Sequence, residues 1–130
     1  MYTLKNISLV LACMLALCAC EKEGSTNNIE AEGIWVGVWG LGSTTPANYE
    51  KWEFKPSAKM SAYNSNGAIL ANGTWHLNQT DIEIEYTPFG LSSGLIYSGT
   101  YDSVQKKITG IWGWEPSKTD GGKFEMNKQE

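Results

Sequence analysis

Residues 81–86 read Asp-Ile-Glu-Ile-Glu-Tyr, an unbroken alternation of acidic and apolar side chains. Successive side chains of a β-strand point to opposite faces, so both isoleucines and the tyrosine share one face and the three carboxylates share the other. The segment therefore predicts a strand with one face in a core and one face in water. From Trp35 onward no window shows apolar residues at helical spacing, so we expect an all-β domain around this strand.

Seven further strands are predicted around residues 81–86, because short alternating or aromatic-rich runs recur with turn residues between them. The turns include Asn64 to Gly67 and Asn78 to Thr80, and the prolines all fall outside the proposed strands. Short links favour antiparallel neighbours, so the pattern predicts an eight-strand antiparallel up-and-down meander. The strands are expected near Trp35 to Leu41, Tyr49 to Phe54, Ala58 to Tyr63, Ile69 to Leu77, Asp81 to Thr87, Leu95 to Tyr101, Lys106 to Trp114 and Gly122 to Met126.

A meander of this kind can close on itself or stay open. Eight strands in about 110 residues can form a closed barrel, whose interior is filled by side chains or holds one small ligand. An open β-sandwich is the alternative. We interpret Asn72-Gly73 as a bulge or bend within one strand, since a hairpin there would leave its strands too short. Alternation directs inward Trp52, Phe54, Met60, Ile69, Ala71, Trp75, Leu77, Leu95, Tyr97, Tyr101, Ile108, Trp112, Trp114, Phe124 and Met126.

Four Gly-x-aromatic units recur over most of residues 35–126: Gly37-Val38-Trp39, Gly73-Thr74-Trp75, Gly99-Thr100-Tyr101 and Gly110-Ile111-Trp112. They resemble the strand signatures of lipocalin-like and avidin-like small barrels, and the first unit lies where lipocalins have their opening Gly-x-Trp. The stretch from Tyr97 to Phe124 is similar to the final hairpins of lipocalin-like domains in bacterial lipoproteins. The resemblance implies a closed lipocalin-like or avidin-like barrel of the calycin type.

The N-terminus has the three-part layout of a secretory signal peptide: a polar start with Lys5, an apolar stretch from Ile7 to Leu17, and small residues after it. This apolar stretch is too short to span a bilayer. Leu17-Cys18-Ala19-Cys20 resembles the bacterial lipobox, and the resemblance implies that Cys20 is lipidated and becomes the mature N-terminus. We therefore expect a signal peptide over residues 1–19, the lipidated cysteine and a flexible tether over 20–33, and an all-β barrel domain over 34–130.

Removal of residues 1–19 leaves Cys20 as the only cysteine, so no disulfide can form within the domain. Cys18 fits the lipobox less well, because Leu17 would then occupy the small-residue position. The acidic segment Glu21 to Ser25 resembles the one that follows the lipidated cysteine in Bacteroidota lipoproteins of the outer leaflet. We expect a protein anchored to the bacterial outer membrane through its N-terminal lipid. The resemblance implies display at the cell surface, and a plain solvated tether is the alternative.

Composition and motifs limit the chemistry. The chain has 130 residues and a net charge of -4, and its ten basic residues are all lysines, which disfavours nucleic acid as a partner. The single histidine, His76, is predicted to face solvent, and no carboxylate is placed to orient it. The carboxylate pairs Glu83 with Glu85 and Glu50 with Glu53 could in principle act as acid and base. For Glu83 and Glu85, which share the solvent face of one strand, surface charge is the favoured interpretation. The sequence therefore predicts no enzyme, no cofactor and no metal site.

The six tryptophans are the candidate ligand-binding residues, because so many large aromatic side chains in a small domain can serve binding as well as packing. In the first strand, two of them lie on the face opposite Ile34, Val36 and Val38, so this face is either covered or forms a binding patch. The candidates are Trp35, Trp39, Trp52, Trp75, Trp112 and Trp114.

Two functions stay open on this basis. The first is a non-enzymatic binding domain that holds a small apolar or saccharide ligand through its aromatic residues. The second is a protein-binding module, such as an inhibitor of an extracellular peptidase or lysozyme. In the second case loops carry the contacts, and Phe89-Gly90-Leu91 is the foremost candidate because it is an apolar loop segment.

Overall fold

The computed structural model describes residues 25–130. The predicted signal peptide, Cys20 and the first part of the predicted tether lie outside these residues. Within residues 25–130 no helix has the length and apolar character that crossing a membrane requires. The described chain consists of a short helix, α2 (Ser25–Ala31), followed by eight strands.

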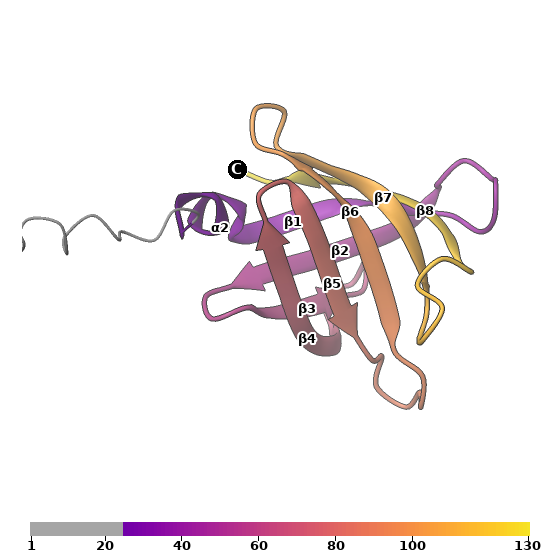
Figure 1. Cartoon of the computed structure of the whole chain (residues 1–130). Helices are drawn as coiled ribbons and strands as arrows, with labels where there is room; N and C mark the ends of the chain where they lie inside the picture. The colour runs from indigo at the N-terminus through magenta and orange to yellow at the C-terminus, as the bar shows by residue number, and fades with distance from the viewer. Residues whose placement is uncertain (1–24) are drawn as a thin grey trace, which may run out of the picture.

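The eight strands form one closed antiparallel barrel, in which each strand pairs with the next and β8 returns to pair with β1 (Figure 1). This arrangement confirms the predicted all-β, eight-strand up-and-down meander and selects the closed barrel over the open sandwich. The largest difference is in the first strand, which begins and ends two residues earlier than predicted. The strands are β1 (Gly33–Trp39), β2 (Asn48–Lys55), β3 (Lys59–Tyr63), β4 (Ile69–Asn78), β5 (Asp81–Tyr86), β6 (Leu95–Asp102), β7 (Lys107–Trp114) and β8 (Gly122–Lys128).

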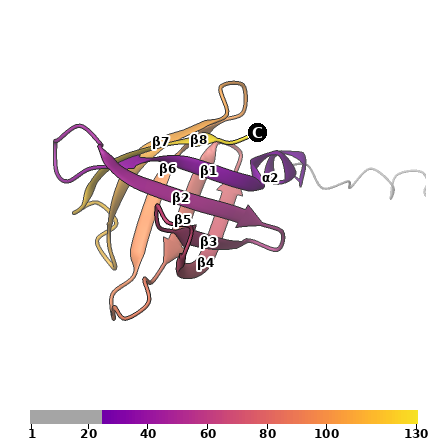
Figure 2. The ribbon, with the colours of Figure 1, turned by 180° about the vertical axis from the view of Figure 1, so that it is seen from behind.

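The alternating direction of the strands divides the connections between the two ends of the barrel. The loops β1–β2, β3–β4, β5–β6 and β7–β8 lie at one end, which we call the open end. The helix α2 and the shorter connections lie at the other end, which we call the closed end (Figure 1). Seen from behind, β1 and β2 cross in front of β5 and β6 at a steep angle (Figure 2), as tilted strands on opposite walls of a barrel do.

The helix α2 lies where the sequence predicted a flexible tether. Its last residue, Ala31, is fully buried, and its main-chain oxygen accepts a hydrogen bond of 2.8 Å from the indole Nε1 of Trp35. Trp35 is also fully buried and packs against Phe54 and Tyr101, with ring centroids 5.9 and 6.1 Å away. These contacts with the barrel hold the helix, which has no apolar periodicity of its own to reveal it in the sequence. Regular structure therefore extends into the predicted tether, where α2 covers Ser25–Ala31.

The barrel interior follows the predicted alternation closely. Almost all the side chains predicted to face inward are buried, and they form one continuous core. Leu77 is only partly buried, and two other predicted core residues are exposed: Ile69 by 48% and Trp114 by 37%. Trp114 is the last residue of β7 and therefore lies at the open end, where the strands diverge into loops.

Ile69 is exposed because of a bulge that the sequence did not indicate. Ala62 pairs with Ala71, but the next residue, Tyr63, pairs with Ile69, so Leu70 is an extra residue in β4. An extra residue reverses the face of every residue beyond it, which turns Ile69 outward. Asn72 and Gly73 lie within one continuous strand, as predicted, but both pair regularly, so the bulge is at Leu70 and not at these two residues.

The four Gly-x-aromatic units have a shared physical explanation. Their glycines lie where neighbouring strands approach most closely, so a Cβ atom there would overlap a main-chain carbonyl group. The aromatic residue two positions later shares the inner face of the strand with its glycine. The glycines thus let the strands approach around an aromatic interior. The overlap would be with the carbonyl of Glu125 at Gly37, Glu85 at Gly73, Thr109 at Gly99 and Ser98 at Gly110.

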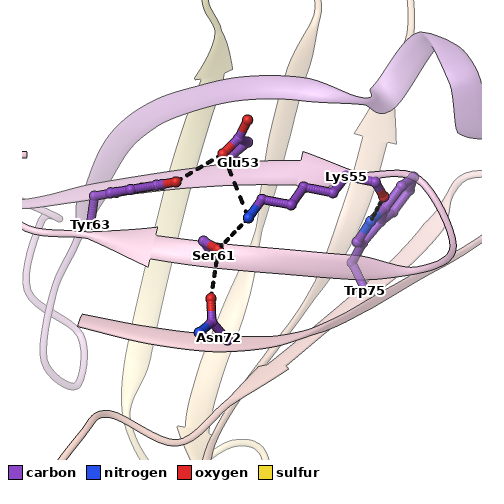
Figure 3. Close-up of polar contacts among 6 residues, drawn as sticks. All are labelled: Glu53, Lys55, Ser61, Tyr63, Asn72 and Trp75. Atoms are coloured by element: carbon purple, nitrogen blue, oxygen red, sulfur yellow. Dashed lines mark hydrogen bonds and ion pairs between the residues drawn. The ribbon is translucent and has the colours of Figure 1, made fainter. Parts of the chain in front are cut away.

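A chain of polar side chains connects β2, β3 and β4 on the outer wall (Figure 3). The hydroxyl of Ser61 accepts a hydrogen bond of 2.9 Å from Lys55 and donates one of 2.7 Å to the side-chain oxygen of Asn72. The Lys55 ammonium also lies 3.9 Å from the Glu53 carboxylate, which accepts a hydrogen bond of 2.8 Å from Tyr63. Ser61 is fully buried beneath these groups, so its polarity is satisfied without water.

Gly110→Ala should destabilise the barrel by about 3 kcal/mol, because the new methyl group would meet only main-chain atoms of β6, which cannot move aside as a side chain can. Urea unfolding of the variant and the wild-type protein measures this difference. The neighbouring exposed residue provides the control, since Thr109→Ala changes only strand propensity, by up to about 1 kcal/mol. Equal losses of stability in the two variants would contradict the explanation given for these glycines.

Candidate functional site

A cavity of about 450 Å³ opens at the open end of the barrel, and we call it the open-end pocket. Its volume falls within the roughly 300–1,000 Å³ that is typical of small-molecule sites. Seven aromatic and four other apolar side chains dominate its lining, and the polar lining residues are Glu50, Asn64 and Ser65. The aromatic residues are Trp39, Tyr49, Tyr63, Tyr86, Tyr97, Trp112 and Trp114, and the other apolar ones are Leu70, Pro88, Leu91 and Leu95.

Three of the six candidate tryptophans, Trp39, Trp112 and Trp114, lie together in the wall of this pocket. Trp112 packs edge to face with the other two, with ring centroids 5.3 Å from Trp39 and 6.2 Å from Trp114. Its indole Nε1 donates a hydrogen bond of 2.9 Å to the main-chain oxygen of Gly40. Together the three form an aromatic wall that β1 and β7 hold on either side of β8.

The other three candidates, Trp35, Trp52 and Trp75, are core residues that do not line the pocket. Trp75 stacks on Phe54 at 4.9 Å, and its Nε1 donates a hydrogen bond of 3.0 Å to the main-chain oxygen of Lys55. The face of β1 that carries its two tryptophans is the inner one, so they form no patch on the outer surface. The structure thus separates the six tryptophans into a packing group and a pocket group.

The sequence interpretation missed the most unusual residue of the pocket, Glu50. Its side chain points into the barrel from β2, is only 6% exposed, and lines the open-end pocket. One carboxyl oxygen, Oε1, accepts hydrogen bonds from the indole Nε1 of Trp52 at 2.9 Å and from the hydroxyl of Tyr86 at 3.1 Å. The other, Oε2, accepts one from the hydroxyl of Tyr97 at 3.1 Å. A carboxyl group with three aromatic donors therefore forms the floor of the pocket.

A signal for Glu50 was present in the sequence. Glu50, Trp52 and Phe54 occupy every second position of β2, so the alternation that directs the two aromatic side chains inward directs Glu50 inward as well. Glu53 lies on the opposite face of the strand, where it contacts Tyr63. The suggested acid and base pair of Glu50 and Glu53 is therefore divided between the inside and the outside of the barrel.

Burial raises the pKa of the Glu50 carboxyl from 4.5 to about 7, because the apolar surroundings disfavour its charge more than the bonds from Tyr86, Tyr97 and Trp52 favour it. Burial and then the negative charge of Glu50 also raise the pKa of both tyrosines above their ordinary value of 10. At neutral pH the two phenols consequently stay protonated as donors, while Glu50 exchanges between its neutral and ionised forms.

Proton counting shows how the cluster accommodates both forms of Glu50. The hydroxyl oxygens of Tyr86 and Tyr97 lie 3.2 Å apart, and each lies 3.1 Å from one carboxyl oxygen of Glu50. The four oxygens therefore form a ring with three oxygen–oxygen contacts at hydrogen-bond distance. Neutral Glu50 supplies a third proton, and each contact then holds one proton. Ionised Glu50 leaves two protons for the three contacts. Because hydrogen bonds to a charged oxygen are the stronger ones, both protons are directed at the carboxylate, and the contact between the phenols holds none. Ionisation therefore leaves the Tyr86–Tyr97 contact without a hydrogen bond.

The other chemical candidates lie away from the pocket. His76 is exposed on the outer wall, as predicted from alternation. Glu83 and Glu85 are half-buried on that wall rather than fully solvated, and partial burial followed by the nearby Glu83 raises the pKa of Glu85. The Lys118 ammonium lies 3.4 Å from a carboxylate oxygen of Glu83. Among the residues that the structure describes, no group of three or more histidine, cysteine, aspartate or glutamate side chains could hold a metal ion.

Comparison with protein-family models, with curated proteins and with solved structures finds no match for this chain. The pocket and the cluster at its floor therefore carry the functional argument.

Glu50→Gln should make the protein more stable relative to wild type as the pH rises. The folded protein holds the Glu50 proton more tightly than the unfolded chain does, so the free energy of unfolding falls as the pH rises from about 4.5 to about 7. Glutamine keeps a donor and an acceptor but cannot ionise. Between pH 5 and pH 8 the stability difference should shift in favour of the variant by about 2 kcal/mol, as measured by urea unfolding.

Glu125→Gln is the matched control, since Glu125 lies on the outer wall of β8 and pairs with Lys107 at 2.7 Å. This variant should keep the pH dependence of the wild-type protein. If wild type and Glu50→Gln showed the same dependence between pH 5 and pH 8, the assignment of a raised pKa to Glu50 would be wrong.

Proposed function

We propose that this chain is a lipid-anchored, extracytoplasmic binding domain that holds a small, largely apolar ligand in the open-end pocket. The observation that carries the proposal is the pocket itself: a cavity of about 450 Å³ with an aromatic wall, at the end of a barrel whose buried apolar side chains form one core cluster. Pockets of this size with mostly apolar walls and a few convergent polar groups are typical of small-molecule binding.

The rim supports entry of a ligand from the open end. Leu91 lines the pocket from the β5–β6 loop and is 52% exposed, and Phe89 in the same loop is 65% exposed. Apolar side chains that stay in contact with water at the mouth of a cavity gain contacts when an apolar ligand arrives. Among the lining residues, neither a histidine nor a second acid accompanies Glu50, and we therefore propose binding rather than catalysis.

The proposed anchor gives the pocket a direction. Cys20 lies outside the described residues, but only residues 21–24 separate it from α2, which lies at the closed end. A lipid at Cys20 would hold the closed end toward the outer membrane. The mouth of the pocket would then face away from the bilayer, where a ligand in the surrounding medium can reach it.

The second candidate function is binding of an extracellular protein, and the exposed Phe89 and Leu91 favour it. Two large apolar side chains in one surface loop are typical of the centre of a protein interface. The same loop borders the pocket, so the two functions differ in what occupies the mouth: a ligand that enters it, or a protein that covers it.

Binding of N-phenyl-1-naphthylamine, a neutral apolar dye, tests the first candidate. The dye should bind saturably and change the emission of the pocket tryptophans. Leu95→Phe should weaken binding by about tenfold or more, because Leu95 is almost buried in the pocket wall and a larger ring there fills the cavity. Ile111→Phe is the control, since Ile111 lies exposed on the outer wall of β7 and should leave binding unchanged.

If neither the dye, a fatty-acid mixture nor a panel of oligosaccharides bound saturably, the small-ligand function would be refuted for these classes. Equal binding by wild type and Leu95→Phe would place the site elsewhere. Loss of a protein partner in Phe89→Ser, with dye binding unchanged, would favour the second candidate.

Cys20→Ser should move the protein from the membrane fraction to the soluble fraction of bacteria that express it, and should abolish incorporation of a labelled fatty acid. The reason is that the lipid chains, each buried CH₂ contributing about 0.8 kcal/mol, provide the hold on the membrane. Cys18→Ser should change neither result. Fatty-acid incorporation that survives Cys20→Ser would contradict the assignment of Cys20.

A further inference from the structure

The floor of the open-end pocket holds an acid that has no cation beside it. The described residues that line the pocket include no lysine, and the lysines that form ion pairs do so with Glu53, Glu83, Glu125 and Glu130 on the outer surface. A buried carboxylate with no counter-ion is unfavourable, and partners of opposite charge usually accompany such groups. When Glu50 is ionised, the pocket therefore has a negative charge without a counter-ion at its base.

The walls above this acid are of the kind that binds cations. Trp39, Trp112 and Trp114 form one side of the pocket, and Tyr86 and Tyr97 stand next to the carboxyl group. Aromatic faces attract ammonium groups, tryptophan most strongly, and the attraction grows when water is excluded. An aromatic enclosure with one carboxylate at its base combines the two features that ammonium recognition requires.

We propose that the open-end pocket selects a small amphipathic organic cation, whose ammonium group rests on the Glu50 carboxylate and whose apolar part lies against the tryptophan wall. This inference rests on the proposed small-ligand function and names the chemical class of the ligand. It also accounts for the position of Glu50: the ammonium supplies the counter-charge that the empty barrel lacks, and its N–H groups reach carboxylate lone pairs that the indole and the two phenols leave free.

Ligands of other charge fit this floor less well. A carboxylate ligand would place a second negative charge beside Glu50, and it could bind only when one of the two acids takes up a proton. A neutral alcohol can donate a hydrogen bond to Glu50, but it brings neither the counter-charge nor the attraction to the aromatic faces. The expected order of affinity is therefore amine, then alcohol, then carboxylate.

The affinity for the amine depends on pH through Glu50. The titratable groups that face the pocket from the surrounding strands are Glu50 and Tyr49 of β2, Tyr63 of β3, Tyr86 of β5 and Tyr97 of β6. Between pH 6 and pH 8 the carboxyl group changes its charge appreciably, because its pKa is about 7, whereas burial raises the pKa of Tyr86 and Tyr97 and the hydrogen bond to Glu53 raises the pKa of Tyr63 above the ordinary value of 10. The amine favours ionised Glu50 and, by reciprocity, lowers the pKa of that acid when it binds.

The experiment uses three probes that share one apolar part, a phenylbutyl group: 4-phenylbutylamine, 4-phenylbutan-1-ol and 5-phenylpentanoate. Isothermal titration of the purified protein should give an affinity for the amine at pH 8 that is about tenfold or more above that for the alcohol. The affinity for the amine should rise about tenfold from pH 6 to pH 8, as the ionised fraction of Glu50 rises. At pH 7 amine binding should release protons into the buffer, which the dependence of the heat on buffer type measures.

Three variants separate the charge of Glu50 from other effects. Glu50→Gln should lose the preference for the amine, the pH dependence and the proton release, while it still binds N-phenyl-1-naphthylamine. Tyr97→Phe keeps the acid but removes one donor that favours its ionised form, so the pH at which amine binding strengthens should move upward. Glu125→Gln removes a charge from the outer wall and should behave as wild type.

The outcomes distinguish this inference from the function on which it rests. Equal binding of amine and alcohol at pH 8, or a preference for the carboxylate, would overturn the selection of a cation and leave the apolar pocket intact. Amine binding that Glu50→Gln does not weaken would overturn it as well. Failure of all three probes together with the naphthylamine dye would refute both the inference and the small-ligand function.

Discussion

Closure of the sheet between β1 and β8 is the constraint on which the rest of the structure depends. Because every strand pairs on both sides, each second residue along each strand must face a single enclosed interior. Toward the closed end aromatic rings stack in that interior: the ring centroid of Phe54 lies 5.9 Å from that of Trp52 and 4.9 Å from that of Trp75. Toward the open end the strands diverge into loops, so the same inward alternation lines a space instead of filling it. The same inward alternation of side chains therefore produces the core at the closed end and the pocket at the open end.

Glu50 shows how strict this constraint is. Its place in β2, two residues before Trp52, puts it inside the barrel whatever the polarity of its side chain. The barrel accommodates it by surrounding it with the polar atoms that aromatic residues carry: the indole of Trp52 and the hydroxyls of Tyr86 and Tyr97. Tyrosine and tryptophan at these positions therefore serve two purposes, since their rings fill the interior and their polar atoms satisfy the acid. Among the described residues, no buried side-chain polar atom lacks a hydrogen-bond partner.

Period-two patterning made the strands and most of the core predictable, because in a β-barrel the face of a residue depends only on its position along the strand. The sequence failed where the outcome depends on a partner elsewhere in the chain. Leu70 becomes a bulge only through its pairing with β3, and α2 is held by Ala31 and Trp35 rather than by its own composition. In the pocket, alternation identified the inward tryptophans but not which of them lie near the mouth. Glu50 was predictable from alternation, but a charged side chain is ordinarily a surface residue, and only its register with Trp52 and Phe54 directs it inward.

The ionised form of Glu50 has opposite effects on folding and on the proposed ligand binding: it lowers the stability of the folded protein and favours binding of a cation. Ionisation of Glu50 removes the hydrogen bond between the two phenols and leaves a negative charge in apolar surroundings, so it weakens the empty folded state. A ligand with a positive charge removes that cost when it binds. The cost of burying the ionised carboxylate without a counter-ion therefore adds to the affinity for such a ligand. A leucine at this position would remove the charge but leave Trp52, Tyr86 and Tyr97 without their acceptor, and the floor would have no counter-charge with which to distinguish an amine from an alcohol. The acid at the floor therefore gives the pocket its chemical selectivity at the expense of stability near neutral pH.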